Sequence, residues 1–472
     1  MEKLNFHSSI LKLFNSSNLL LLKTMRSISG NIVNEGRIFS GSIKIDGDTI
    51  VDIITTDSKH DPSAQGERPA EEPIYILPGV IDEHVHFREP GLTDKGDILT
   101  ESRAAAAGGV TTVFDMPNTI PQTTSITSLT EKLTLAREKS IINYAAFIGA
   151  TSDNLGELRK VNAAMIPGIK LFMGASTGNM LVSNDEALDN IFALAAERHL
   201  PIVAHCEDSQ MIAANASRIR TTMGDDAPVE QHSVIRDEAV CLNSTRKAIA
   251  LAERHKTQLM VAHVSTAAEI QEIAKHSTFV KAEGCVSYLT FCCRDYLRLG
   301  ALIKCNPAIK GEADRLALRQ ALGNGKIYSI ATDHAPHLLS QKEGGAFQAA
   351  SGMPSVQFSL AMMLNMADEG WLTLPQVAEL MSHNPARYFG IEQRGFLRKG
   401  MKADITIVRR LNRPRIITNE QVVSKCGWSP YAGMETRWQV DQTICNGVTV
   451  YKHSGLTVAG SATQQIAFCH DA

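Results

Sequence analysis

The sequence lacks the features that mark several specialised classes of protein. None of its nine cysteines belongs to a C-x-x-C pair, so neither a paired-cysteine site nor a disulfide framework is indicated, and we expect reduced thiols in the cytoplasm. No apolar run approaches the roughly 20 residues of a membrane span. Lys and Arg (47) nearly balance Asp and Glu (50), so the net charge of −3 would attract neither nucleic acid nor an anionic membrane.

The composition is that of an ordinary globular protein. Apolar residues make up 44% of the 472 residues, charged residues 21% and aromatics 6%, which excludes disordered, collagen-like and coiled-coil chains. The first 24 residues differ in composition from the rest of the chain. Their apolar run, Leu19 to Leu22, is too short and too interrupted for a signal peptide. We expect residues 1–24 to be a poorly ordered leader, or Met25 to be the true start.

Apolar β runs alternate with helical stretches through the middle of the chain. Eight runs, each followed by a helical stretch, predict a (β/α)8 barrel of the TIM type over residues 76–392. This span exceeds the typical ~250 residues, so we expect loop insertions, the longest at 206–258. The runs are residues 75–86, 110–115, 144–149, 168–172, 201–205, 259–263, 278–283 and 327–332.

Short strands are predicted at both ends of the chain. Alternating apolar residues and turn residues indicate strands within residues 28–54, and again at 395–408 and 441–451. We therefore expect a small β-sandwich domain built from both ends. Its parts would be residues 25–75 and 393–455, with a C-terminal tail over 456–472.

Histidine and aspartate stand at the ends of several predicted barrel strands. Strand one runs into His84-Val85-His86, strands five and six end at His205 and His263, and strand eight ends at Asp333. Active sites of such barrels lie at the C-terminal ends of the strands. His84 and His86 are two residues apart and therefore point the same way. Imidazole nitrogens with a carboxylate oxygen suit zinc, and also manganese or cobalt, so we predict a metal site.

Lys170 lies within an apolar strand. An unpaired buried amine is costly and tends to lose its proton. A neutral amine can react with CO2 to form a carbamate, whose two oxygens can bridge two cations. The residues leave open a second interpretation, in which Lys170 pairs with an acid.

Nine short motifs, in order along the chain, resemble those of dihydroorotases in the amidohydrolase superfamily. The similarity covers about residues 28–455. The motifs are HVHFREPG at 84–91, AAAAGGVTT at 104–112, DMPNT at 115–119, GIKLF at 168–172, AHCE at 204–207, AHVS at 262–265, NP at 306–307, DHAPH at 333–337 and GxLxxGxxAD at 395–404.

The resemblance implies two divalent metal ions, most readily Zn²⁺, and a hydroxide between them that attacks a ring carbonyl. Asp333 would act as general base and then as general acid. The implied ligands are His84, His86 and Asp333 for the first ion, His205 and His263 for the second, and carbamylated Lys170 (N6-carboxylysine) between them.

The resemblance also implies that Arg88, Asn118 and His337 hold the free carboxylate of the substrate. A guanidinium pairs bidentately with a carboxylate. Dihydroorotate carries such a group, whereas allantoin and unsubstituted hydantoins do not, and allantoinases generally have Asn where Arg88 stands. From the residues alone, Arg88 could instead form a surface ion pair with Glu89 or Asp94.

The loop after the DHAPH motif departs from the family pattern. Many members have Pro-Phe-Gly where this chain has Ala350-Ser351-Gly352. We still expect substrate contacts from Ser351 and Gly352, and the resemblance adds Asn306. Residues 338–352 are either a lid or an ordinary connection. His232 is expected at the surface.

The resemblance predicts reversible conversion between (S)-dihydroorotate and N-carbamoyl-L-aspartate in pyrimidine (UMP) biosynthesis, in the cytoplasm. The expected partners are the small-molecule substrate, a second copy in a homodimer, and aspartate transcarbamoylase. Two alternatives stay open. One is another cyclic amidohydrolase, namely a hydantoinase (dihydropyrimidinase) or an allantoinase. The other is a non-catalytic dihydroorotase-like subunit.

Overall fold

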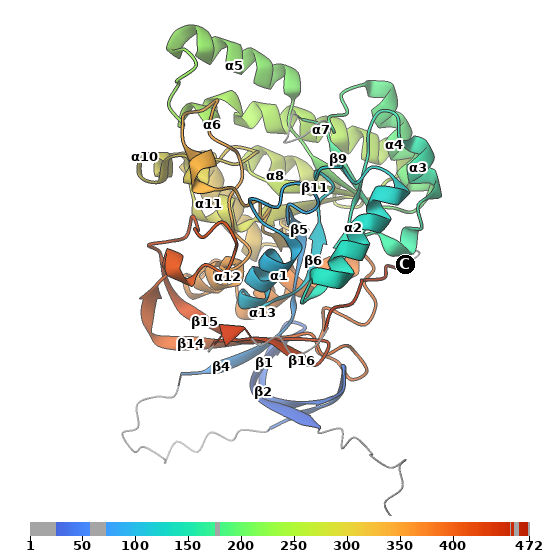
Figure 1. Cartoon of the computed structure of the whole chain (residues 1–472), viewed down its shortest axis with the longest axis vertical. Coiled ribbons are helices and arrows are strands. Elements are labelled where there is room, and N and C mark those ends of the chain that lie inside the picture. The colour runs from blue at the N-terminus through green and yellow to red at the C-terminus, as the bar shows by residue number, and fades with distance from the viewer. Residues whose placement is uncertain (1–24, 57–71, 175–179, 454, 457–461, 471–472) are drawn as a thin grey trace, which may run out of the picture.

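The computed structural model describes residues 25–56, 72–174, 180–453, 455–456 and 462–470. The predicted leader, residues 1–24, lies outside them. Figure 1 shows a helix-covered barrel above a separate β sheet. None of the helices in the described part of the chain is long and apolar enough to cross a membrane.

The predicted barrel is confirmed. Its strands pair in parallel with their neighbours. A bridge between Val85 and His334, three residues after the last strand, closes the barrel onto its first strand. The strands are β5 (Val80–Val85), β6 (Val110–Asp115), β7 (Asn143–Ala146) with β8 (Ile148–Gly149), β9 (Ile169–Phe172), β10 (Ile202–His205), β11 (Leu259–Val264), β12 (Val280–Cys285) and β13 (Ser329–Ala331).

Helices follow the strands and cover the barrel (Figure 1). The 206–258 insertion folds as α5, α6 and α7, and α5 rises farthest above the barrel. The helices are α1 (Ile98–Ala107), α2 (Ile126–Lys139), α3 (Leu155–Lys160), α4 (Asp185–Glu197), α5 (Ser209–Met223), α6 (Gln231–Ile235), α7 (Glu238–His255), α8 (Ala267–Ile273), α9 (Val286–Thr290), α10 (Tyr296–Leu299), α11 (Glu312–Gly323), α12 (Ser359–Asp368), α13 (Leu374–Ala378) and α14 (Asn384–Tyr388).

Polar caps fix where several of these helices begin. The Asp97 carboxylate accepts a hydrogen bond from the Thr100 amide at 2.9 Å at the start of α1. Asp237 does the same for the Val240 amide at 3.0 Å at the start of α7. Because a cap satisfies an otherwise unpaired amide, it ends the preceding loop at a defined residue.

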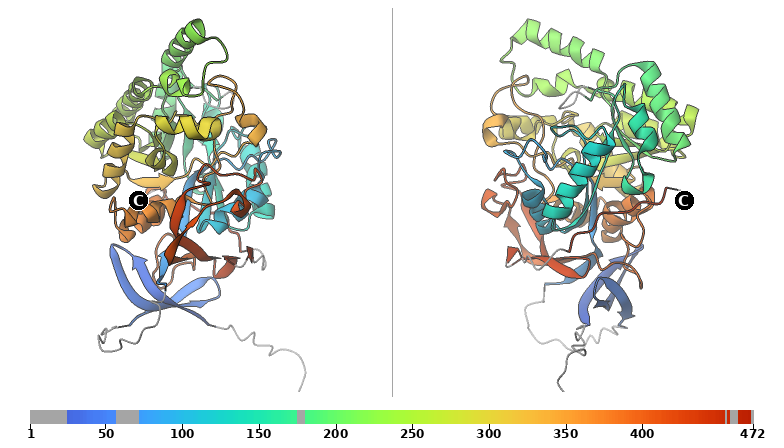
Figure 2. Two further views of the ribbon diagram at one scale, coloured as in Figure 1. Left: turned by 90° about the vertical axis from the view of Figure 1, so that its left-hand side faces the viewer. Right: turned by 45° about the vertical axis from the view of Figure 1, so that its right-hand side comes forward.

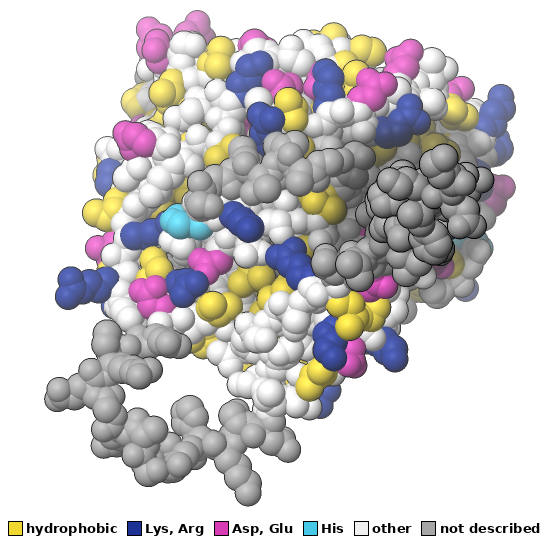
Figure 3. Space-filling model, turned by 60° about the horizontal axis from the view of Figure 1, so that its bottom comes forward, with side chains coloured by type: hydrophobic (Ala, Val, Ile, Leu, Met, Phe, Trp, Pro, Cys, Tyr) yellow, Lys and Arg dark blue, Asp and Glu magenta, His cyan; other side chains and the backbone are white. Residues whose placement is uncertain are grey.

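The β-rich domain is built from both ends of the chain, as predicted. Its strands join in the order β17-β16-β15-β14-β4-β1-β2-β3, and Figure 2 shows the sheet strongly curved. On the face seen in Figure 3, charged side chains of both signs are interspersed. The strands are β1 (Arg26–Asn34), β2 (Arg37–Asp46), β3 (Thr49–Thr55), β4 (Ile74–Pro78), β14 (Ile405–Ile416), β15 (Glu435–Cys445), β16 (Val448–Lys452) and β17 (Gly455–Leu456).

One predicted strand is divided between the two sheets. Residues 75–86 were expected to form the first barrel strand, but β4 pairs with β1 and β14 in the outer sheet. The chain changes sheets at Gly79, whose amide donates to the carbonyl of Asp404 just before β14, while the next amide, of Val80, donates to the Gly109 carbonyl beside the barrel. A Cβ at Gly79 would lie 2.2 Å from the Thr111 side chain. The apolar run could not reveal this change, because both halves are buried.

The end of the chain packs against the barrel. Within the predicted tail, Ile466 and Phe468 are buried in one apolar cluster with Phe114 and Phe389. The Phe114 and Phe468 rings lie 5.4 Å apart. Residues 462–470 therefore add to the core, while the domain boundaries drawn from the sequence stay predictions.

Candidate active site

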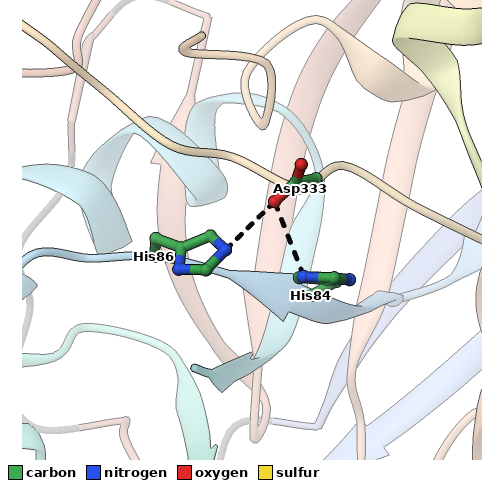
Figure 4. Close-up of side chains that lie close together, drawn as sticks. All are labelled: His84, His86 and Asp333. Carbon is green, nitrogen blue, oxygen red and sulfur yellow. Dashed lines mark hydrogen bonds and ion pairs between the residues drawn. The ribbon is translucent and has the colours of Figure 1, made fainter. Parts of the chain in front are cut away.

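Three of the predicted metal ligands converge where β5 and β13 end. Figure 4 shows His84 and His86 pointing toward Asp333. The Asp333 Oδ1 atom lies 3.0 Å from His86 Nε2 and 3.5 Å from His84 Nε2. One potential ligand atom from each side chain lies within 4.8 Å of the other two. This arrangement suits a divalent cation.

Hydrogen bonds fix the tautomers of both histidines. His84 Nδ1 donates to Glu283 Oε1 at 2.8 Å, and His86 Nδ1 donates to Asn118 Oδ1 at 2.7 Å. Each ring therefore keeps a lone pair on Nε2, the atom that faces Asp333. Burial lowers the pKa of both histidines, which favours the neutral, metal-binding form.

His205 and His263 form a second pair of facing nitrogens. His205 Nδ1 lies 2.9 Å from His263 Nε2, and His205 Nε2 donates to Glu207 Oε2 at 2.9 Å. His263 Nδ1 has no hydrogen-bond partner among the described residues. Burial alone would raise the pKa of Glu207, but Arg236 and His205 lower it to about 2. A permanent carboxylate thus keeps the lone pair of His205 on the nitrogen facing His263.

Lys170 lies beside these histidines. Its Nζ is fully buried, 3.5 Å from His84 Nε2 and 5.2 Å from the centre of the Phe172 ring. Among the described residues, no carboxylate lies within 4.0 Å of it, so the geometry does not show the alternative acid pair. Burial lowers the pKa of Lys170, although Glu283 and Asp333 oppose that shift. The site thus favours a less basic amine next to metal-binding nitrogens.

A cavity opens beside His86 and Asp333. It gathers five of the predicted substrate residues, from loops that are far apart in the sequence. The cavity is lined by His86, Arg88, Asn118, Asn306, Asp333, Ala335, Ser351 and Gly352. Two of the predicted metal ligands, His86 and Asp333, therefore line the same cavity as these predicted contacts.

Arg88 is buried in this cavity, with 3% of its surface exposed. Its Nε donates to the Pro336 carbonyl at 3.0 Å, and its Nη2 lies 3.2 Å from His337 Nε2. No carboxylate lies within 4.0 Å of it in the described part of the chain, so the surface ion pair is not formed. Burial lowers its pKa only to about 10, and the guanidinium stays charged at neutral pH. A buried cation that contacts no carboxylate is costly and suits an anionic ligand.

The family profile described as the amidohydrolase family matches residues 75–450. The chain belongs to the amidohydrolase family. Dihydroorotase from Methanosarcina acetivorans is 34% identical over 82% of this chain and 83% of that protein. Allantoinase from Bacillus velezensis is 31% identical over 82% and 86%. The solved L-hydantoinase (dihydropyrimidinase) from Arthrobacter aurescens has a TM-score of 0.84 and 27% identity, over 93% of this chain and 98% of that one.

Three buried residues of this amidohydrolase site escaped the sequence analysis. His232 was expected at the surface, but it is buried, with Nε2 3.0 Å from Asn306 Oδ1. Glu283 ends the seventh predicted strand, so the rule that identified Asp333 would also have found it. Glu207 lies two residues after His205, within a quoted motif. Its contact with Arg236 depends on α6 folding over the barrel, which no local pattern indicates.

Proposed function

We propose that this amidohydrolase is a dihydroorotase that interconverts (S)-dihydroorotate and N-carbamoyl-L-aspartate. The observation that carries the proposal is the buried Arg88 guanidinium, which lines the same cavity as His86 and Asp333 but has no carboxylate within 4.0 Å among the described residues. A neutral hydantoin or allantoin ring would leave that cation unpaired, whereas the carboxylate of dihydroorotate would neutralise it. The likeness to a protein named dihydroorotase supports the same conclusion.

We propose two Zn²⁺ ions bridged by carbamylated Lys170. The donor set supports this, because the metal-facing nitrogens of His84, His86 and His205 are kept unprotonated by their buried partners. When bound, the ions would supply an activated water as nucleophile and polarise the ring carbonyl. Manganese and cobalt suit the same ligands.

Residues of the chain itself would transfer the proton and orient the substrate. Asp333, as a proposed metal ligand, would be held as the carboxylate when the cations are bound. It would take the proton from the attacking water and pass it to the ring nitrogen as the carbon–nitrogen bond breaks. In ring closure, Asp333 takes the proton from the ureido nitrogen. Arg88 and Asn118 would orient the substrate carboxylate, with His337 supporting Arg88.

A substrate comparison tests the proposal. The chain, purified with Zn²⁺ and bicarbonate, is assayed with dihydroorotate, allantoin and an unsubstituted hydantoin, and its bound metal is counted. We expect turnover of dihydroorotate and about two metal ions per chain. Turnover of the neutral rings alone would favour the hydantoinase or allantoinase alternative. Bound metal without turnover would favour a non-catalytic subunit.

Further proposals rest on the family resemblance alone. We propose a homodimer that works in the cytoplasm and associates with aspartate transcarbamoylase. Light scattering of the purified chain, with and without that enzyme, tests both associations. A monomer at micromolar concentration would contradict the dimer.

A further inference from the structure

Basic side chains bind the carbonyl groups of Ala349–Gly352, the segment that includes two cavity residues. Lys304 Nζ donates to the Ala349 carbonyl. Lys342 Nζ donates to the carbonyls of Ala350 and Gly352, both at 2.7 Å. The fourth carbonyl, of Ser351, lies 3.1 Å from His337 Nε2. Side chains thus hold the carbonyl groups of this segment, while the amides of Ala350 and Gly352 donate to the carbonyls of Gln341 and Lys304, both at 2.8 Å.

Lys342 uses all three of its N–H donors. Besides the two carbonyls above, its Nζ donates to the Lys304 carbonyl at 3.0 Å. Lys342 is 5% exposed, and no carboxylate within 4.0 Å in the described part of the chain balances its charge. The Trp428 ring centre lies 6.0 Å away. Because an ammonium has three donors and no acceptor, this arrangement is saturated and directional.

Lys342 links the two sides of the cavity. The Lys304 carbonyl that it binds also accepts the Gly352 amide at 2.8 Å, and residue 304 lies two positions before the cavity residue Asn306. Gly352 leaves little freedom for an alternative position. Its φ is +134°, and a Cβ there would lie 2.7 Å from the Ala335 carbonyl oxygen. A change at Lys342 would therefore alter the distance between Asn306 and the Ser351–Gly352 pair.

We propose that Lys342 is a positioning residue for the substrate cavity, although it does not line it. Its ammonium fixes the carbonyls of Lys304, Ala350 and Gly352, and so sets the width of the cavity between Asn306 and Ser351. A buried amine is costly, and an apolar side chain of equal length could not bind three carbonyls. The kinetic consequence rests on the proposed function, whereas the structural consequence does not.

Amide hydrogen exchange tests the structural part. Lys342→Met keeps the length of the side chain and removes its donors, and Lys399→Met changes an exposed lysine as a matched control. We expect the amides of Ala350 and Gly352 to exchange about tenfold faster in K342M than in the wild type or K399M. Lys342→Gln, which keeps two donors, should be intermediate and replaces K342M if that variant does not fold. Equal exchange in all variants would overturn the proposal.

Steady-state kinetics test the positioning role. We expect the KM for dihydroorotate to rise about tenfold in K342M, while kcat and bound metal change less than about twofold. K399M should match the wild type. An unchanged KM would overturn the positioning role. If even the wild type fails to turn over dihydroorotate, the proposed function has failed, and the exchange comparison alone decides whether Lys342 holds the segment.

Discussion

Three residues of the candidate site have positive φ angles, which residues other than glycine seldom adopt. The φ angles of Arg88, His263 and Asp333 are +68°, +40° and +48°. Such conformations cost on the order of 1–3 kcal/mol each and persist where the surroundings over-determine them. Hydrogen bonds hold two of these residues in place. The His263 amide donates to Glu283 Oε1 at 2.8 Å, and Arg88 Nε donates to the Pro336 carbonyl. The strained positions thus coincide with the residues proposed to bind metal and substrate.

The role of Arg88 leads to the first prediction. Arg88→Ala should lower kcat/KM for dihydroorotate at least about 100-fold, because a desolvated charge-assisted contact is lost. Any activity on unsubstituted hydantoin should fall much less, since that ring has no carboxylate. Parallel assays of both substrates check this, with the exposed Arg413→Ala as control. Equal losses on both rings would contradict the assignment of Arg88.

Glu207 supports a second prediction about metal affinity. Glu207→Gln leaves a neutral amide beside His205 Nε2 and weakens the preference for a lone pair on Nδ1. We expect affinity for one of two Zn²⁺ ions to fall about 10- to 100-fold. Chelator competition measures this without any assay of activity. The control variant Glu197→Gln, at an exposed position, should bind Zn²⁺ as tightly as the wild type does. Wild-type affinity in E207Q would exclude the proposal that Glu207 orients His205.

At the scale of elements, the loop after β13 is attached to the 206–258 insertion. The Ala346 amide donates to the Ala227 carbonyl at 2.9 Å. Ala346 and Phe347 pack with Ile219 of α5 and Ile235 of α6. From the sequence alone, residues 338–352 could be either a lid or an ordinary connection. The structure shows this loop packed against the 206–258 insertion, so the loop and the insertion form one packed unit.

This attachment predicts the effect of Phe347→Ala. The Phe347 ring lies 4.1 Å from the guanidinium carbon of Arg220 on α5. Removing it should raise amide exchange across residues 343–348, because this part of the loop loses its packing against α5. Exchange in the barrel strands should stay unchanged. Faster exchange across the whole barrel would instead assign Phe347 to the global core.

At the scale of the whole molecule, Lys342 makes stability depend on pH. Burial lowers its pKa from 10.5 to about 7, with Lys304 and Arg88 adding to the shift and Cys305 opposing it. Between about pH 7 and 10 the unfolded chain therefore binds a proton that the folded chain does not, and the neutral amine of folded Lys342 keeps two of the three N–H donors that the ammonium has below pH 7. The free energy of unfolding of the wild type, relative to K342M, should rise by up to ~1.4 kcal/mol per pH unit in that range. Urea midpoints at pH 6 to 9 check this, and a constant difference would contradict the lowered pKa of Lys342.

Metal removal gives a prediction for the molecule as a unit. The proposed ligands come from five different barrel strands or their ends, so bound metal should stabilise the closed barrel by linkage. Dialysis against a chelator should abolish activity and lower the melting temperature. If Lys170 is carbamylated, recovery needs both Zn²⁺ and bicarbonate. Calorimetry and activity after each addition measure this, and full recovery from Zn²⁺ in CO2-free buffer would contradict the carbamate.

The sequence by itself determined the barrel and the residues at its rim. Alternation of buried strands with helices is a local pattern, and the C-terminal ends of parallel strands always meet at one edge. His84, His205, His263 and Asp333 could therefore be predicted to lie together. Arg88 was recognisable because its motif is local.

Only the tertiary structure decided which groups complete the site. The change of sheet at Gly79, the burial of His232, and the contacts of Glu207 with Arg236 and of Lys342 with Gly352 join segments separated by loops or whole helices. Local periodicity carries no information about such pairs, because each depends on how the insertions fold back over the barrel. Burial then sets their charges, since the environment rather than the residue type determines the pKa of a side chain.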